Sequence, residues 1–440
     1  MITSDNEIHL LLDSESIDCN ISSLSRRARS LLKYRIVKPL VFFRTPDLAN
    51  NDMLREIIPI EIVREKERIV CVKVPVGKMK ATYGINKFAN VYAQKFGEIL
   101  FNKKILTPDE IRPIELAFIQ SSLNEFSGRN LLVTENKVLL ENRQWLQGRF
   151  STPLNIFSME EAAEMIDLSW KKDSLFYISP YLTTSKHNWY WLSFRTKVPN
   201  YHVDVSRFKS GNTLGDLFRR SILDAFSQRF CFLLMSIDEM GFKFCAPVNN
   251  DTIEDMTYHF NYFILLITGI FDSLALHTKN QYHLFEDSEK ISPYKISLRS
   301  KIGKKFLQAV EQKNPALRKH IHDNVDLINA PYLLRELIAH RESLHPQHFN
   351  IDGANANFLF VTDNFSECLR RLGDDQEKGG CSKFGVYSRT FLSPFIFAKA
   401  MATLISKFCN RYLELLGYKN SILESNASDF LAFQADNLGF

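Results

Sequence analysis

Apolar and polar positions follow one pattern in the first half of the chain and another in the second half. In residues 57–76, two runs rich in apolar and β-branched residues, IIPIEIV and IVCVKVPV, flank the charged segment REKER. Such runs favour strands, and the short charged segment between them predicts a β-hairpin. Residues 131–140 show a similar arrangement around Glu135 and Asn136, which predicts a second hairpin.

Other segments of the first half predict helices and further strands. Helices are expected at 86–101 and at 107–126, where a Thr-Pro-Asp-Glu sequence is a good helix start. Ser158 and Glu161 show the capping-box pattern of a helix that runs to about residue 170. Aromatic and β-branched residues predict strands at 175–182 and 189–198. Both faces of the latter are apolar, as in a central strand covered on both sides.

Beyond residue 212, apolar residues recur every three or four positions, which is the spacing of one helix face. The first run stops at Gly241, which predicts a helix end there, and a long helix is expected from about residue 251 through Tyr282. Further helices are predicted at about 304–310, 315–325, 333–344 and 393–416, with a Gly-rich polar loop at 372–387.

These patterns predict an α+β fold. Residues 1–210 are expected to form a mixed α/β or β-rich domain, residues 211–420 an all-α helical bundle, and residues 421–440 a C-terminal tail. A chain of 440 residues exceeds what one hydrophobic core usually organises. Its 45% apolar and 24% charged residues are typical of globular proteins.

Composition and motifs narrow the classes of protein. The seven cysteines are scattered without zinc-binding spacing, which favours reduced thiols in a cytoplasmic protein. The N-terminal segment lacks the basic flank of a signal peptide. The most apolar window, 260–276, is interrupted by Asn261 and Asp272, so we expect a buried core helix and no membrane association. The nucleotide-binding and hydrolase motifs GxxxxGK[ST], GxGxxG, HExxH and GxSxG do not occur.

The candidate chemistry lies in residues 331–349, PYLLRELIAHRESLHPQHF. Arg335 offers a planar charged fork that suits a phosphate, and His340 can move a proton at neutral pH. Together they could cleave RNA without a metal or cofactor. His340 would handle the proton of an attacking 2′-hydroxyl or of the leaving oxygen. Arg335 would stabilise the charge on the phosphoryl oxygens.

The spacing of this pair sets a geometric condition. Five residues on a helix rotate by about 500°, so the two side chains diverge by about 140°. A neighbouring helix or a second subunit is therefore expected to complete the site. The alternative is that Glu336 and His340, four residues apart, form an ordinary surface pair, and that Arg335 and Arg341 are solvated charges.

The segment Arg335 to Arg341, RELIAHR, resembles the HEPN superfamily, whose ribonuclease members carry an arginine, four to six residues and a histidine. The order of elements is also similar over residues 213–418: a long helix ending FDSLALHTKNQY, a basic connection, the motif helix, a loop, and a last helix ending LELLGY. The resemblance implies a homodimer with the site at its interface. Active members usually place Asn, Asp or His after the arginine, where this chain has Glu336. Unless it is paired, this carboxylate would repel RNA.

Two further features supply candidate residues. Asp272 lies in the long apolar helix, and the resemblance implies that an acidic residue there approaches the motif; the alternative is a carboxylate on the wet edge of the helix. Residues 299–322 contain seven Lys and Arg but one acid. A basic stretch can follow a phosphate backbone or can be a solvated face. The candidate RNA contacts are Arg299, Lys301, Lys304, Lys305, Arg318, Lys319 and Arg341.

The sequence therefore predicts a cytoplasmic, metal-independent endoribonuclease that binds RNA, acts as a homodimer and uses residues 1–210 as a sensor or regulatory domain. The resemblance also implies a role as a toxin or antiviral abortive-infection effector. Two alternatives stay open. The helical half could be a non-catalytic RNA-binding or dimerisation module in which Glu336 marks lost chemistry, or a plain interaction scaffold without RNA affinity.

Overall fold

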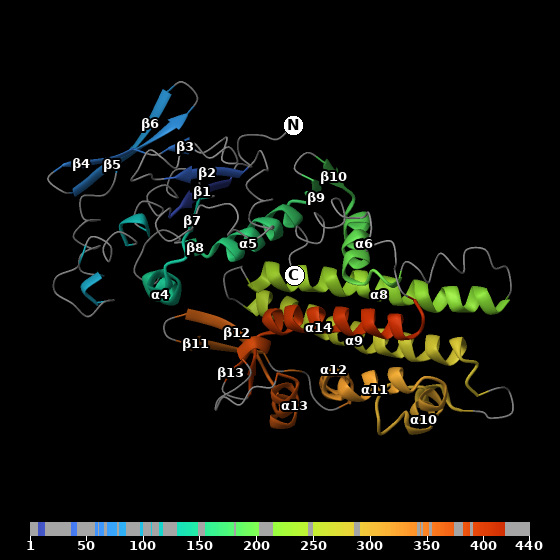
Figure 1. The fold of residues 1–440 in the computed structure, drawn as a ribbon. Helices are drawn as coiled ribbons and strands as arrows, with labels where there is room; N and C mark the ends of the chain where they lie inside the picture. Colours follow the sequence, from blue (N-terminus) through green and yellow to red (C-terminus); the bar gives the residue numbers. More distant parts are fainter. Residues whose placement is uncertain are drawn as a thin grey trace.

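Helices dominate the described part of the molecule, and the sheets are small, which is compatible with the predicted α+β class. The computed structural model describes residues 8–13, 37–41, 58–59, 61–65, 68–76, 79–84, 97–99, 107, 114–117, 130–147, 155–179, 182–201, 214–244, 250–285, 291–340, 344, 346–351, 354–373, 382–387 and 390–418. The sheets of the first half lie at one end, and the long helices extend away from them (Figure 1).

The first half contains a parallel sheet with strand order β3-β2-β1-β7-β8. Its strands are β1 (Ile8–Leu12), β2 (Val37–Val41), β3 (Ile58–Pro59), β7 (Asn130–Val133) and β8 (Ile156–Phe157). The chain adds β2 and β3 on one side of β1 and later adds β7 and β8 on the other, and all pairs are parallel. This strand order is that of doubly wound sheets.

The first half also contains a separate three-stranded antiparallel meander. The hairpin predicted at 57–76 is confirmed as the pair β4 (Glu61–Glu65) and β5 (Arg68–Val76), and β6 (Met79–Gly84) extends it. The helices predicted at 86–101 and 107–126 lie mostly outside the described residues, of which 97–99 and 114–117 are helical.

The hairpin predicted at 131–140 is wrong, because β7 is followed by helix α4 (Lys137–Gln147). The amide of Leu139 donates to the side-chain oxygen of Asn136 at 3.2 Å, so Asn136 caps the helix that replaces the expected second strand. The helix predicted after Ser158 is confirmed as α5 (Met159–Lys172). Its capping box joins the Ser158 hydroxyl and the Glu161 carboxylate to each other's backbone.

The strand predicted at 189–198 is also wrong. Its residues belong to helix α6 (Lys186–Lys197), whose first turn is capped by the Ser185 hydroxyl, the acceptor for the Asn188 amide. Six of the ten residues at 189–198 are apolar or aromatic, and they fall on both faces of an expected strand. The sequence therefore carries no clear period, and a buried helix fits it as well as a strand. The preceding prediction holds, since β9 (Phe176–Ser179) pairs with β10 (Leu182–Thr184).

Two long helices, α8 (Leu214–Phe244) and α9 (Asn250–Gln281), form a hairpin at the centre of the second half. Gly241 does not end α8 as predicted. A Cβ at this position would lie 2.9 Å from Cε2 of Phe395, so the glycine permits close packing against helix α14 (Pro394–Leu415). The predicted start of α9 is correct to within one residue. Of the described helices, α9 alone is long and apolar enough to cross a membrane, and 61% of its most apolar window is buried within the fold.

Shorter helices complete this half. They are α10 (Lys304–Lys313), α11 (Pro315–Asp323), α12 (Val325–His340), α13 (Asp363–Gly373) and α14 (Pro394–Leu415). The motif helix α12 begins eight residues before the predicted start at 333, and Pro331 lies inside it. The last helix ends as predicted before Gly417, whose φ of +92° suits a glycine.

The prediction that the second half is all-α is wrong. Between α12 and α14 lies an antiparallel sheet of order β11-β12-β14-β13, formed by β11 (Pro346–Ile351), β12 (Ala354–Phe360), β13 (Val386–Tyr387) and β14 (Phe391–Leu392). Ile351 pairs with Ala354. The sequence between them is Asp352-Gly353, a dipeptide typical of two-residue hairpin turns. The Asp-Gly dipeptide could have predicted this hairpin from the sequence, although the flanking segments have the apolar spacing of helices.

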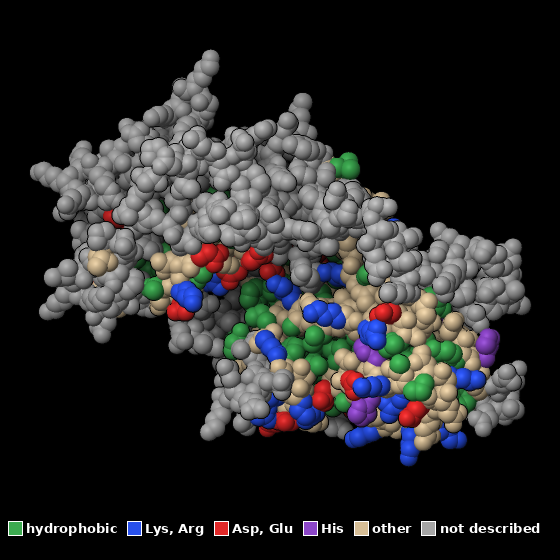
Figure 2. All heavy atoms as spheres, in the orientation of Figure 1, with side chains coloured by type: hydrophobic (Ala, Val, Ile, Leu, Met, Phe, Trp, Pro, Cys, Tyr) green, Lys and Arg blue, Asp and Glu red, His purple; other side chains and the backbone are tan. Residues whose placement is uncertain are grey.

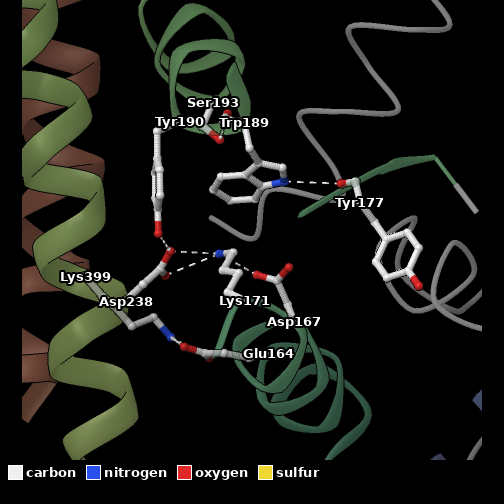
Figure 3. A network of polar contacts seen from close by, with 9 residues as sticks. All are labelled: Glu164, Asp167, Lys171, Tyr177, Trp189, Tyr190, Ser193, Asp238 and Lys399. Atoms are coloured by element: carbon white, nitrogen blue, oxygen red, sulfur yellow. Dashed lines mark hydrogen bonds and ion pairs between the residues drawn. The ribbon is translucent and has the colours of Figure 1, made fainter. Parts of the chain in front are cut away.

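Helix α5 connects the first half to the helical half through buried charges (Figure 3). Lys171 Nζ lies 2.7 Å from Asp167 on its own helix and 3.0 Å from Asp238 on α8. Its ammonium also lies 4.0 Å from the centre of the Trp189 ring on α6, and the Tyr190 hydroxyl donates to Asp238 at 2.7 Å. Burial alone would lower the pKa of Lys171, but the two carboxylates outweigh it and raise the pKa above its ordinary value.

A second ion pair fixes the same helix to α14, since Lys399 Nζ lies 2.6 Å from both carboxylate oxygens of Glu164. Side chains of α5 and α6, among them Leu168 and Phe194, belong to the same apolar core as those of α8 and α9. The packing of α5 is therefore continuous with that of the long helices.

Candidate functional site

Helices α9 and α12 pack against each other, and the segment 291–303, with the short helix η3 (Pro293–Lys295), lies beside them. Between these elements is a pocket of about 790 Å³. The charged and aromatic side chains that line it are Asp272, Tyr294, Arg299, Tyr332, Arg335 and Glu336. Two of the predicted site residues, Asp272 and Arg335, thus share one pocket with the predicted RNA contact Arg299.

The spacing of residues along α12 explains part of this arrangement. Tyr332, Glu336 and Ala339 follow one another at intervals of four and three residues, with Arg335 beside them, so they share one face of the helix. The opposite wall depends on Gly303, whose amide donates to the Arg299 carbonyl at 2.7 Å. A Cβ at Gly303 would lie 1.9 Å from the Ser297 carbonyl oxygen. Glycine therefore permits the turn that carries Arg299.

Asp272 is held from α12 by two groups. The Tyr332 hydroxyl donates to Asp272 Oδ1 at 2.7 Å, and Arg335 Nη1 lies 3.8 Å from Oδ2. Burial, together with the nearby charge of Asp272, raises the pKa of Tyr332 well above its ordinary value. Tyr332 therefore stays a neutral hydrogen-bond donor, and the carboxylate keeps a fixed position beside Arg335.

Glu336 is paired with Arg299. Arg299 Nη2 lies 2.7 Å from Glu336 Oε1, and the guanidinium of Arg299 also lies over the Tyr332 ring, 4.7 Å from its centre. The guanidinium of Arg335 lies 6.0 Å from the same ring centre. The carboxylate after the motif arginine was expected to repel RNA unless it had a partner, and Arg299 is that partner. The charge at this wall of the pocket is therefore balanced in part.

His340 is the last residue of α12, and the structure describes its backbone but not its side chain. Arg341 lies outside the described residues. Arg335 and His340 belong to one continuous helix, so their Cα atoms are related by a rotation of about 140° and a rise of about 7.5 Å. The geometric condition expected from the sequence therefore applies: the two residues leave the helix in different directions.

Most of the basic residues predicted to contact RNA do not line the pocket. Lys301, Lys304, Lys305 and Lys319 are exposed, and Arg318 is half-buried on α11. Of the predicted RNA contacts within the described residues, only Arg299 lines the pocket. Figure 2 shows Lys and Arg side chains at several places on the helical half, with apolar and acidic side chains between them.

Neither tyrosine of the pocket was predicted as a site residue. Tyr332 precedes Arg335 by three positions, so its helical spacing was a usable signal. Tyr294 lies in a segment between helices, and no periodicity indicated its position. Among the described residues, no group of three or more His, Cys, Asp or Glu could hold a metal ion.

Comparison of the chain with protein-family models, with curated proteins and with solved structures found no match. Function must therefore be inferred from the pocket and from the residues of the motif.

Proposed function

We propose that the protein is a metal-independent endoribonuclease of the HEPN type, with Arg335 and His340 as its reacting groups. The observation that carries this proposal is the pocket in which Arg335, Arg299 and Asp272 meet at the motif helix. The side chain of Arg335 is 42% exposed, so its guanidinium is accessible to a phosphate. Asp272 would act as a positioning residue for Arg335.

The reaction would need proton transfer and charge stabilisation only. His340 would take the proton of a ribose 2′-hydroxyl as that oxygen attacks the adjacent phosphorus. The bond from phosphorus to the 5′-oxygen would break, and the leaving oxygen would take up a proton. Arg335 would stabilise the charge on the phosphoryl oxygens. The products would be a 2′,3′-cyclic phosphate and a 5′-hydroxyl end.

The proposal includes a homodimer formed through the helical half. Tyr258, Tyr262 and Leu265 on α9 are 67%, 37% and 45% exposed. Asp272 follows Leu265 by seven residues, so the three apolar side chains and the pocket carboxylate lie on one face of α9. A second copy that covered this face would reach the pocket, which supports a site completed by residues of two subunits.

A non-catalytic RNA-binding module is the second candidate. One observation favours it: each pocket arginine already has a carboxylate beside it, Glu336 at 2.7 Å from Arg299 and Asp272 at 3.8 Å from Arg335. Such pairs could hold the arginines for binding without leaving a free charge for catalysis. This module would bind RNA and release it whole.

A role as a toxin or antiviral abortive-infection effector in the cytoplasm belongs to the same proposal, with residues 1–210 as the part that senses the trigger. This role rests on the motif of Arg335 and His340 and on the RNA cleavage that the motif implies. Growth arrest on expression of the wild-type chain, and its loss in His340→Ala, would support this role.

The test compares wild type with Arg335→Ala and His340→Ala on total cellular RNA in EDTA. His322→Ala is a matched control, because this histidine on α11 is 74% exposed and away from the pocket. The expected result is cleavage to 2′,3′-cyclic phosphate ends by wild type and the control, and none by the two site variants. Equal cleavage by His340→Ala would contradict the proposal. RNA that is bound but left whole by wild type would favour the binding module.

A further inference from the structure

The ring of Tyr294 stands at the rim of the pocket and is the most exposed large apolar side chain among the described residues, at 68%. It belongs to η3, next to Lys295, whose ammonium lies 5.7 Å from the ring centre. Proteins that bind unpaired bases combine exposed aromatic rings with Lys and Arg, because a base stacks on the ring while the cations contact the phosphates. Tyr294 has this environment.

The other aromatic ring of the pocket is already covered. Tyr332 carries the guanidinium groups of Arg299 and Arg335 at 4.7 and 6.0 Å from its centre, and its hydroxyl is bonded to Asp272. Among the described lining residues, Tyr294 is therefore the ring open to a base. Tyr332 instead holds the two cations inside the pocket.

We propose that this pocket takes one unpaired base of single-stranded RNA, stacked on Tyr294, with the flanking phosphates at Arg299 and Arg335. The inference deepens the proposed function by assigning a base-binding position on Tyr294 in the same site, and it rests on that function only for cleavage. A paired base is stacked within its duplex and is not available to Tyr294, so double-stranded RNA is excluded from the pocket.

The carboxylates add a preference among bases. Asp272 and Glu336 are 44% and 47% exposed, and each has lone pairs beyond those used by its partners. A carboxylate accepts hydrogen bonds from exocyclic amino groups, which guanine, adenine and cytosine carry and uracil lacks. The pocket therefore favours an amino-bearing base over uracil.

Binding is measured by fluorescence anisotropy with a labelled 2′-O-methyl oligouridine that contains one central guanosine, which cannot react through its 2′-oxygen. The oligonucleotide is used single-stranded and annealed to its complement. Wild type should bind the single strand about tenfold more tightly than the duplex. Tyr294→Leu should lose about tenfold in affinity, whereas Tyr294→Phe should keep it. Tyr387→Leu, at an exposed tyrosine of β13 outside the pocket lining, is the control.

The outcomes separate the two proposals. Equal binding by wild type and Tyr294→Leu, equal or tighter binding of duplex, or an all-uridine strand bound as tightly as the guanosine strand would overturn the inference, even if unmodified RNA is cleaved. The absence of any binding would overturn it as well. Binding with the expected pattern, but without cleavage of unmodified RNA, would support the inference and contradict the nuclease proposal.

Discussion

The effect expected of Glu336 on RNA binding depends on whether its carboxylate has a partner. In the sequence it is a negative charge directly after the motif arginine, and it argues against RNA at that position. In the structure it binds Arg299 at 2.7 Å. Asp272, by contrast, lies beside Arg335 as the resemblance implied, and Tyr332 holds it there. Local charge patterns therefore indicated the right residues but not their pairing, because the partners come from segments 37 and 60 positions away.

Replacement of Glu336 tests whether its charge limits RNA binding. In Glu336→Gln, Arg299 would lose the carboxylate that balances part of its charge in wild type, so it would attract a bound phosphate more strongly. RNA affinity should rise several-fold, and the slope of log affinity against log salt should steepen by about one. Anisotropy titrations at several salt concentrations measure both quantities.

Glu311→Gln is the matched control, because it removes the same charge from an exposed position on α10 outside the pocket lining. An equal gain in affinity from Glu311→Gln would mean that only the net charge matters. Unchanged affinity in Glu336→Gln would contradict a role for Arg299 in phosphate binding.

At the scale of elements, the sequence was most informative where apolar spacing and a cap agreed. The capping box at Ser158 and the long helix through Gln281 are examples. It failed where apolar residues follow no clear period, as at 189–198, because such a segment fits a buried helix as well as a covered strand. It also failed at 131–140, where the Asn136 side chain caps a helix. Packing in the apolar core decided the first segment, and a local cap decided the second.

The pocket depends on a turn that the sequence did not reveal. In Gly303→Ala, the new Cβ would clash with the Ser297 carbonyl oxygen, 1.9 Å from its ideal position. The turn that carries Arg299 would have to move, and we expect a loss of at least about 1 kcal/mol in the free energy of unfolding. RNA affinity should fall at the same time.

Urea unfolding and RNA anisotropy measure these two effects. Ser300→Ala, at an exposed position of the same turn, should stay within about 0.5 kcal/mol of wild type. A fully stable Gly303→Ala variant with normal affinity would show that the turn does not position Arg299.

At the scale of the whole molecule, ion pairs made by α5 fix this helix to α8 and α14. One ammonium, Lys171, faces the two carboxylates of Asp167 and Asp238. Lys171→Met would leave two partly buried carboxylates without their cation. The free energy of unfolding should fall by about 3–5 kcal/mol at pH 7. Lys172→Met, which removes an exposed charge next in sequence, should have little effect.

The same interaction predicts a pH dependence. The pKa of Lys171 in the folded protein lies above its ordinary value of 10.5. The folded state therefore holds this proton more tightly than the unfolded state, and the resulting stability is fully present below pH 10.5. It should be lost as the pH rises through the raised pKa. Urea unfolding between pH 9 and pH 12 should show this loss, above pH 10.5, in wild type and not in Lys171→Met. Parallel curves for the two proteins would contradict the assignment.

The central claim is that Arg335 and His340 form a site completed by two subunits, and subunit mixing tests it most directly. Arg335→Ala and His340→Ala proteins are each assayed for RNA cleavage in EDTA, then unfolded together, refolded as a mixture and assayed again. Each variant alone should be inactive. In the mixture, about half of the dimers would hold one copy of each variant, and one of their two sites would be intact. The account therefore predicts recovery of about a quarter of wild-type activity. A mixture that forms heterodimers and stays as inactive as its parents would contradict it.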